Sequence, residues 1–249
     1  MRLVVLGCSG GYPGPGRACS GYLLETSSAR FWIDCGSGTL AELQRHCALP
    51  GLSAIVVTHL HADHWTDLPL AIHTMGFMHP EMRRVPVYGP AGFVDACGIT
   101  LRWRLEDETP VFEPRELRDG LVATVGEARV EAIQVDHSNL ETYGLRISGN
   151  GLTFAYSADS GPCEQLERLA AGADLFLCEA GTTEEFPSMH LNAGQAATIA
   201  ATAGARRLVL THLNPDDDPR RAEAVARDAF GGDVAVAQDG LVMEVGTLL

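Results

Sequence analysis

Within six consecutive positions, 59–64, the chain has four side chains of types that bind metals: His59, His61, Asp63 and His64. They directly follow the apolar run Ala54–Val57, which reads as a buried strand. A strand that ends here would deliver them to the edge of a sheet, where α/β proteins bind ligands. His59 and His61 alternate, so extended backbone can point both toward one metal, while Asp63 and His64 can serve a second. The spacing therefore predicts a site for two metal ions.

Three later apolar runs are also followed, within a few residues, by a metal-binding side chain. In chain order these side chains are His137, Asp159 and His212. Taken singly, a histidine or an aspartate at the end of a strand is more often structural than functional. Together they repeat one design, in which a buried strand places a ligand at its C-terminal end. Imidazole and carboxylate ligands without thiolate suit zinc, with manganese and iron as alternatives.

Short apolar runs and helical patterns alternate along the chain, and these elements must position the ligands. The predicted strands are Leu3–Leu6, Tyr22–Glu25, Phe31–Ile33, Ala54–Thr58, Val85–Tyr88, Val130–Val135, Tyr143–Ile147, Thr153–Tyr156, Leu175–Cys178, Arg207–Leu210, Val234–Val236 and Leu241–Val245. The predicted helices are Thr39–Cys47, Leu68–Met78, Gly92–Ile99, Glu164–Ala171, Asn192–Ala203 and Pro219–Phe230. Strands joined by short turns occur together with βα units. This combination favours an α/β fold of two sheets with helices outside, in one domain over 1–249. The charged segment Arg102–Gly120 is the candidate for an insertion.

The 18 basic residues of this 249-residue chain are all arginine, which excludes mechanisms that need lysine. Excluded are P-loop phosphate binding, Schiff-base and pyridoxal chemistry, and the protein-kinase lysine. The formal net charge of −14 argues against binding nucleic acid or anionic lipid through diffuse positive charge. No apolar run reaches the ~18 residues of a membrane span, and nothing near Met1 reads as a signal peptide. Seven cysteines without a metal-binding spacing predict reduced thiols in a cytoplasmic protein.

The H-x-H-x-D-H motif, followed by a strand-end histidine, aspartate and histidine, resembles the metallo-β-lactamase superfamily. The resemblance implies an αββα sandwich, in which two mixed sheets are flanked by helices. It also implies one metal on His59, His61 and His137, a second on Asp63, His64 and His212, and Asp159 as a bridge between them. Two such metals would lower the pKa of a water toward neutrality and bind a phosphate oxygen. Asp63 could orient that water or accept its proton.

Two later segments resemble those of ribonuclease Z-like enzymes within this superfamily. Leu177–Thr182 is similar to their H-E-A-T segment, with Cys178 in place of its histidine, and Met189–Ala197 is similar to their H-S-T-A-x-Q-A-A segment. This similarity implies that Glu179 orients His190. It implies that His190 donates a proton to the leaving oxygen or stabilises charge on the phosphoryl group.

The glycine-rich segment Gly7–Ser20 resembles the first turn and loop of the same branch. Such a loop can lie against a phosphate, and Arg17 and Ser20 are the predicted substrate contacts. A purely structural turn is the alternative.

Glu179 comes only 20 positions after Asp159. This interval is too short for the long glycine- and basic-rich arm of the ribonuclease Z that trims transfer RNA. The negative net charge of the chain also disfavours a long RNA substrate, although it does not exclude nucleic acid. These features favour a dinuclear phosphodiesterase for a small anionic phosphodiester. The segments Gly7–Pro15 and His59–His64 also resemble small members of the superfamily proposed to hydrolyse cyclic nucleotides, and this resemblance makes a 3′,5′-cyclic nucleotide the leading substrate.

Three other functions remain open at this point. The first is a ribonuclease Z-type endoribonuclease for precursor transfer RNA, which keeps the chemistry and changes the substrate. The second is a thioester, lactone or β-lactam hydrolase, and the third is a metal-binding or oxidoreductase scaffold. Relatives often form dimers, so the resemblance is also compatible with a homodimer.

Overall fold

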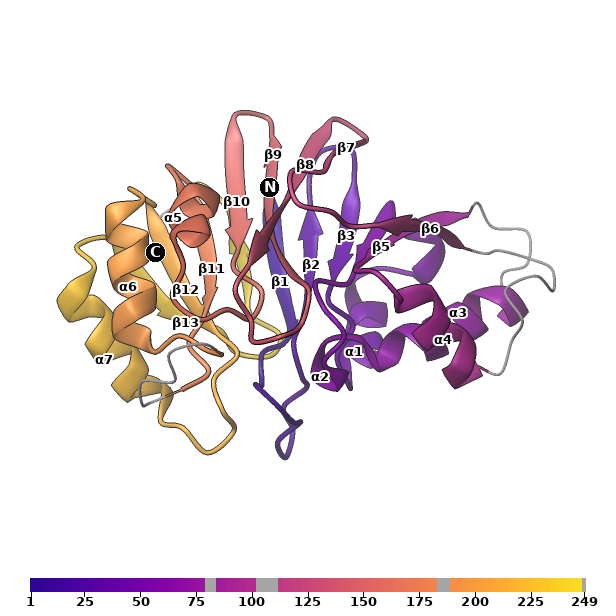
Figure 1. Cartoon of the computed structure of the whole chain (residues 1–249), viewed down its shortest axis with the longest axis horizontal. Coiled ribbons are helices and arrows are strands. Elements are labelled where there is room, and N and C mark those ends of the chain that lie inside the picture. Colours follow the sequence, from indigo (N-terminus) through magenta and orange to yellow (C-terminus); the bar gives the residue numbers. More distant parts are fainter. Residues whose placement is uncertain (79–83, 102–111, 183–188, 248–249) are drawn as a thin grey trace.

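The computed structural model describes residues 1–78, 84–101, 112–182 and 189–247. Two seven-stranded sheets face each other in these residues, and helices cover their outer sides (Figure 1). The sheets and helices thus form the four layers of an αββα sandwich.

The first sheet has the strand order β14-β1-β2-β3-β4-β5-β6. Its strands are β1 (Arg2–Gly7), β2 (Gly21–Glu25), β3 (Arg30–Ile33), β4 (Ala54–Val56), β5 (Val85–Gly89), β6 (Phe112–Glu116) and β14 (Val242–Glu244). The helices on its side of the molecule are α1 (Thr39–His46), the single-turn α2 (Ala62–Trp65), α3 (Asp67–Met78) and α4 (Phe93–Leu101) (Figure 1). A 3₁₀ turn, Leu49–Gly51, precedes β4.

The second sheet has the strand order β13-β12-β11-β10-β9-β8-β7. Its strands are β7 (Val122–Val125), β8 (Ala128–Val135), β9 (Thr142–Gly149), β10 (Leu152–Tyr156), β11 (Leu175–Glu179), β12 (Arg207–Thr211) and β13 (Asp233–Val236). The helices on its side are α5 (Glu164–Ala170), α6 (Ala193–Thr202) and α7 (Pro219–Ala229) (Figure 1).

Apolar runs form the central strands because both faces of each sheet are buried. In β1, Leu3 and Val5 point into the core between the two sheets, whereas Val4 and Leu6 point into the core beneath the helices of the first sheet. This alternation follows from the two-residue period of a strand. The same period divides β11 between the central core and the core beneath α5 and α6.

The predicted strands and helices are all present, with ends that differ by at most two residues. The prediction missed α2, β6 and β7. Residues 112–116 were assigned to an insertion, but they form β6, which pairs in parallel with β5 at the edge of the first sheet. Edge strands tolerate charged residues and proline, which is why Phe112–Glu116 does not read as a strand. The rest of the predicted insertion up to residue 111 lies outside the described residues.

Two further expectations concern the chain as a whole. The seven cysteines are all free thiols, and all but Cys163 are buried. Across the described segments, no helix combines the length and apolar character that crossing a bilayer requires.

The ends of several strands meet at one edge of the sandwich. β8 and β10 run in the same direction because each pairs antiparallel with β9, and β11 and β12 continue in parallel. The loops that follow these strands therefore leave from the same edge of the second sheet. In Figure 1 this is the lower edge, where α2 follows β4 of the first sheet.

Candidate metal centre

The seven side chains expected to bind metal lie in two overlapping groups. The first group is His59, His61, His137 and Asp159, and the second is Asp63, His64, Asp159 and His212. Within each group, one ligand atom per residue lies within 4.8 Å of all the others. Asp159 belongs to both groups, so its carboxylate is the group able to bridge two ions. The arrangement is compatible with a dinuclear site for divalent metals.

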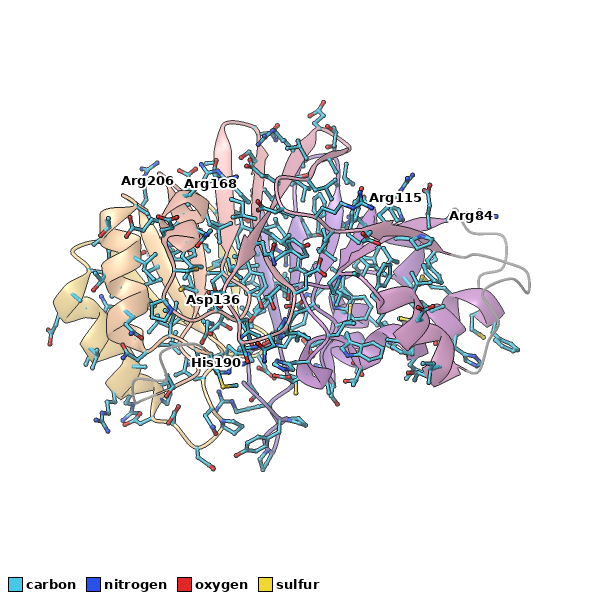
Figure 2. The ribbon with its side chains drawn as sticks, in the orientation of Figure 1. Arg84, Arg115, Asp136, Arg168, His190 and Arg206 are labelled. Atoms are coloured by element: carbon cyan, nitrogen blue, oxygen red, sulfur yellow. The ribbon has the colours of Figure 1, made fainter. Side chains whose placement is uncertain are left out.

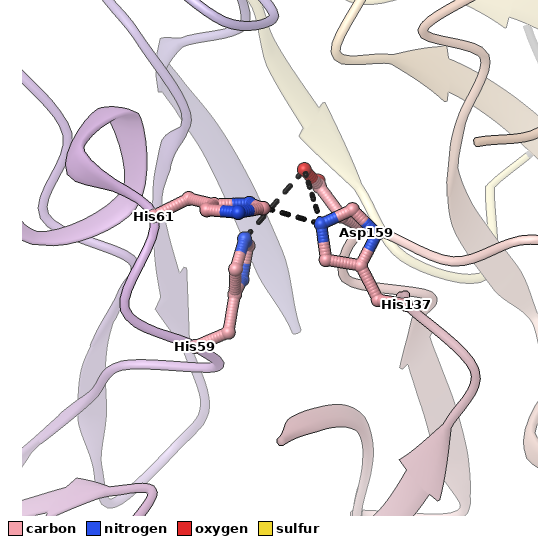
Figure 3. A group of neighbouring side chains, drawn as sticks. All are labelled: His59, His61, His137 and Asp159. Atoms are coloured by element: carbon pink, nitrogen blue, oxygen red, sulfur yellow. Dashed lines mark hydrogen bonds and ion pairs between the residues drawn. The ribbon is translucent and has the colours of Figure 1, made fainter. Parts of the chain in front are cut away.

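The first group gathers imidazoles from two loops around one carboxylate oxygen (Figure 3). Asp159 Oδ2 lies 3.6 Å from His59 Nε2 and 3.9 Å from His137 Nε2. His61 completes the group, with its Nδ1 atom 2.9 Å from His137 Nε2. Imidazole nitrogens and a carboxylate are typical zinc ligands.

The second group lies on the other side of the same carboxylate. His64 Nε2 is 3.2 Å from Asp159 Oδ1, and His212 Nε2 is 3.2 Å from Asp159 Oδ2. Asp63 Oδ2 is 3.5 Å from His64 Nε2 and 3.8 Å from His212 Nε2. The backbone N–H of Gly11 donates to the same Asp63 oxygen over 2.8 Å, so the glycine-rich loop fixes this carboxylate.

Four of the imidazoles have their Nδ1 atoms anchored on the side away from the cluster. The partners are Thr58 Oγ1 for His59, Asp34 Oδ2 for His64, the Met189 carbonyl for His137 and Ser20 Oγ for His212, at 2.7–3.1 Å. An acceptor at Nδ1 keeps the proton there and leaves the lone pair of Nε2 for the cluster. Metal-binding histidines are held in this way in other proteins.

Three buried polar atoms at the centre make no hydrogen bond: His59 Nε2, His64 Nε2 and Asp159 Oδ1. All three belong to residues no more than 1% exposed. A buried polar atom without a partner costs about 1–3 kcal/mol, so a protein rarely leaves three together. Divalent metals would satisfy all three at once. The residues present therefore fit a metal pair.

Burial and neighbouring charge shift the pKa values of the central groups in opposite directions. Burial and the nearby His64 hold the pKa of His59 well below its ordinary value. Burial also lowers the pKa of His64, but the carboxylates of Asp159 and Asp34 outweigh it and raise that pKa well above the ordinary value. Burial raises the pKa of Asp159, but His212 and His64 outweigh it, and the carboxylate stays ionised.

Three residues at the ends of strands adopt a left-handed backbone although they are not glycine. Asp34, Ala158 and His212 have φ angles of 53°, 54° and 57°. Each such residue costs about 1–3 kcal/mol, and such strain concentrates at functional sites. His212 is itself a member of the cluster, Asp34 contacts His64 from behind, and Ala158 directly precedes Asp159.

Glu179 and His190 form a pair beside the ligand cluster. His190 Nδ1 lies 3.0 Å from Glu179 Oε1, and the Glu179 carboxylate also accepts the backbone N–H groups of Ser160 and Gly181 at 2.8 Å. Figure 2 shows His190 at the lower edge of the second sheet. Burial lowers the pKa of His190, but the hydrogen bond and charge of Glu179 outweigh it and raise the pKa to about 9. The ring is 5.1 Å from that of His137 and 5.5 Å from that of His212, centre to centre.

The two residues predicted to contact substrate lie in different surroundings. Ser20 is fully buried, and its Oγ atom lies 2.9 Å from His212 Nδ1, which places it behind a ligand and away from the space a substrate would enter. Arg17 is half-buried, and its Nη1 atom donates to the Pro215 carbonyl over 3.3 Å. Ser20 is therefore positioned to hold His212, and the structure shows Arg17 bound to the loop after β12.

Sequence reasoning missed Asp34, which the structure places behind His64. Its carboxylate accepts hydrogen bonds from the backbone N–H and hydroxyl of Thr58, from Tyr156 and from His64. The signal was present in the sequence, because Asp34 directly follows the apolar run Phe31–Ile33 as the ligands follow theirs.

Comparison with known proteins agrees with this geometry. The sequence model described as "Beta-lactamase superfamily domain" matches residues 29–213. The protein ML1173 of Mycobacterium leprae is 35% identical over 255 residues, covering 98% of this chain and 89% of its own length. YhfI of Bacillus subtilis, a probable metallo-hydrolase, is 28% identical over 250 residues, covering 98% of this chain and 100% of its own. Ribonuclease Z of Myxococcus xanthus is 28% identical over 301 residues, covering 98% of both chains.

The crystal structure of YhfI, described as a metallo-β-lactamase fold protein, extends this agreement to the fold. It matches with a TM-score of 0.87 at 26% identity over 98% of this chain and 99% of its own. The chain therefore belongs to the β-lactamase superfamily, which confirms the family and the αββα fold predicted from its motifs. Its fold, its histidine–aspartate cluster and these relatives define a metallo-hydrolase.

Proposed function

We propose that this chain is a metal-dependent phosphodiesterase for a small phosphodiester, with a 3′,5′-cyclic nucleotide as the leading substrate. The observation that carries the proposal is the hydrogen bond between Glu179 and His190, next to the two ligand groups. A phosphodiester needs a group that stabilises or protonates the departing oxygen, and this pair is suited to that step.

The two ligand groups would hold one divalent ion each, with zinc as the expected metal. When bound, such ions supply positive charge to a phosphate and lower the pKa of a water toward neutrality. Their ligands would be His59, His61 and His137 for one, and Asp63, His64 and His212 for the other, with Asp159 between them.

Asp63 is the carboxylate proposed to orient the attacking water and accept its proton. Its side chain is 10% exposed, compared with 2% for Asp159, so Asp63 is the more accessible of the two carboxylates. The hydrogen bond from Gly11 to one of its oxygens fixes its orientation. Positioning of this kind reduces the reorganisation that proton transfer requires.

His190 is the group proposed to assist the leaving oxygen. Glu179 is itself fixed by two backbone N–H groups, so it can hold the His190 ring in one orientation. With Nδ1 engaged by Glu179, the Nε2 atom of His190 is the nitrogen left to face substrate. A protonated imidazole there can donate to an alkoxide as it departs.

Cleavage of precursor transfer RNA is the second candidate, because relatives at 28% identity are named ribonuclease Z. Two features favour a smaller substrate. Residues 160–179 are fully described and contain only α5, β11 and their short connections. The net charge of −14 also opposes an extended contact with RNA phosphates.

The test is a panel of substrates offered to the metal-loaded protein. It would contain bis-p-nitrophenyl phosphate, 3′,5′-cyclic nucleotides, precursor transfer RNA and nitrocefin. The proposal expects hydrolysis of the phosphodiesters, with kcat/KM highest for a cyclic nucleotide. Efficient cleavage of precursor transfer RNA with weak activity on cyclic nucleotides would replace it by the ribonuclease function, and nitrocefin turnover alone would place the chain among β-lactam hydrolases.

A further inference from the structure

A groove leads away from the ligand cluster along the beginnings of α6 and α7. Next to the cluster it is a cavity of about 350 Å³ whose lining includes His190 and His212. It continues into a second cavity of about 460 Å³ beside α7, and Thr182 and Asp217 line both. Each volume lies within the ~300–1,000 Å³ typical of small-molecule sites. A substrate with its phosphate at the cluster could thus extend into the groove.

The outer cavity has an apolar side and an acidic side. Leu213, Ala222 and Val225 supply apolar surface, and Val225 keeps 44% of its surface exposed. The loop after β12 supplies the consecutive carboxylates Asp216–Asp218. A wall of this kind suits a planar group whose faces are apolar and whose edge carries hydrogen-bond donors.

The groove does not suit a second phosphate. The helix N-termini that border it are already capped, because Asn192 accepts the Gln195 N–H at α6 and Asp218 accepts the Arg220 N–H at α7. The three carboxylates also outnumber the guanidinium of Arg221 in the lining. A neutral group is therefore favoured over an anion.

Asp217 is the carboxylate best placed to accept a hydrogen bond from such a group. Asp216 accepts a hydrogen bond from the Tyr12 hydroxyl over 3.1 Å, Asp218 caps α7, and the backbone N–H of Asn214 approaches the carboxylate of Asp217. Asp217 is half-buried and is the carboxylate that lines both cavities.

We infer that the groove binds the base of a nucleotide whose phosphate lies at the ligand cluster, and that Asp217 accepts a hydrogen bond from an amino group of that base. Carboxylates accept hydrogen bonds from the exocyclic amino groups of bases. This inference rests on the proposed phosphodiesterase function. It makes Asp217 a determinant of specificity, with no role in the bond-breaking step.

The experiment compares three substrates in the parent protein and in Asp217→Ala and Asp217→Asn. The substrates are 3′,5′-cyclic AMP, its analogue with an unsubstituted purine, and bis-p-nitrophenyl phosphate. Loss of a hydrogen bond to a charged group is expected to raise KM for cyclic AMP about tenfold in Asp217→Ala. KM for the other two substrates should not change, because neither offers an amino donor.

Controls separate recognition from folding. Asp228→Asn removes an exposed carboxylate of α7 outside the groove and should leave all three KM values unchanged. Asp217→Asn keeps the shape of the side chain, so a KM increase for cyclic AMP in this variant, at an unchanged melting temperature, supports recognition by the carboxylate. Equal changes for cyclic AMP and its analogue, or no change for either, would overturn the inference. If the parent hydrolyses none of the three substrates, the proposed function fails and the inference fails with it.

Discussion

The carboxylate of Asp34 lies 2.8 Å from Nδ1 of His64, and both side chains are fully buried. Asp34 directly follows β3 in a left-handed conformation and also accepts a hydrogen bond from the hydroxyl of Tyr156 on β10. One carboxylate thus joins the two sheets directly behind a predicted metal ligand. This contact holds the Nδ1 side of the His64 ring in one orientation.

Replacing Asp34 by asparagine is expected to weaken metal binding. The amide keeps the size of the side chain but loses the charge that fixes the His64 imidazole, so metal affinity should fall about 10- to 100-fold. Titration of the chelator-stripped protein with Zn²⁺ against a competing indicator measures the change. Asp95→Asn, an exposed position on α4, is the matched control. Unchanged affinity in Asp34→Asn would show that His64 needs no such support.

Ser20→Ala distinguishes a residue that supports His212 from one that contacts substrate. The hydroxyl lies 2.9 Å from His212 Nδ1 and is buried, so its removal should lower metal affinity and leave KM of the metal-saturated protein unchanged. Zinc titration and steady-state kinetics at saturating zinc provide the two readings. An increase in KM with unaltered metal affinity would restore the role predicted from the glycine-rich loop.

His190→Ala should retain both metals and lose roughly 10²–10⁴-fold in kcat, the range for removal of a general acid or base. The loss of kcat in Glu179→Gln should be smaller, because the glutamine amide oxygen can still accept a hydrogen bond from the His190 ring. Elemental analysis of each variant establishes metal content beside the rate measurement. Full activity in His190→Ala would remove this residue from the mechanism.

Gly36→Ala tests the close approach of two backbone segments. A Cβ atom at this position would lie 2.1 Å from the carbonyl oxygen of Asp63, so the H-x-H-x-D-H loop would have to move. We expect a stability loss of about 1–3 kcal/mol, together with weaker metal binding. Gly231→Ala, where the added atom meets nothing within 4 Å, is the control for denaturant unfolding. Equal stability of the two variants would contradict the packing seen at Gly36.

Most of the architecture could be predicted from the sequence because both faces of each central strand are buried. Runs such as Leu3–Leu6 and Leu175–Cys178 are continuously apolar for that reason and stand out in the chain. The edge strands β6 and β7 have exposed faces, and β6 also contains three charged residues and a proline, so no comparable pattern marks Phe112–Glu116. The hydrophobic pattern of an edge strand is weak, because its conformation depends mainly on pairing with the neighbouring strand.

The grouping of the seven proposed ligands could also be predicted, because four lie in one motif with narrow spacing and each of the other three follows a buried strand. Asp34 occupies the same kind of position but has no motif around it, and its role depends on contacts with Thr58, His64 and Tyr156, which only the fold brings together. The surroundings of Ser20 could not be predicted for a related reason. The sequence places it in a glycine-rich loop but does not reveal that the loop turns its hydroxyl toward His212.

The most direct test of the account is the rate of bis-p-nitrophenyl phosphate hydrolysis as Zn²⁺ is added back to the chelator-stripped protein. Two ligand groups that share Asp159 predict that full activity returns only as the second equivalent of metal binds. Full activity at one equivalent, or in the stripped protein, would contradict a dinuclear phosphodiesterase.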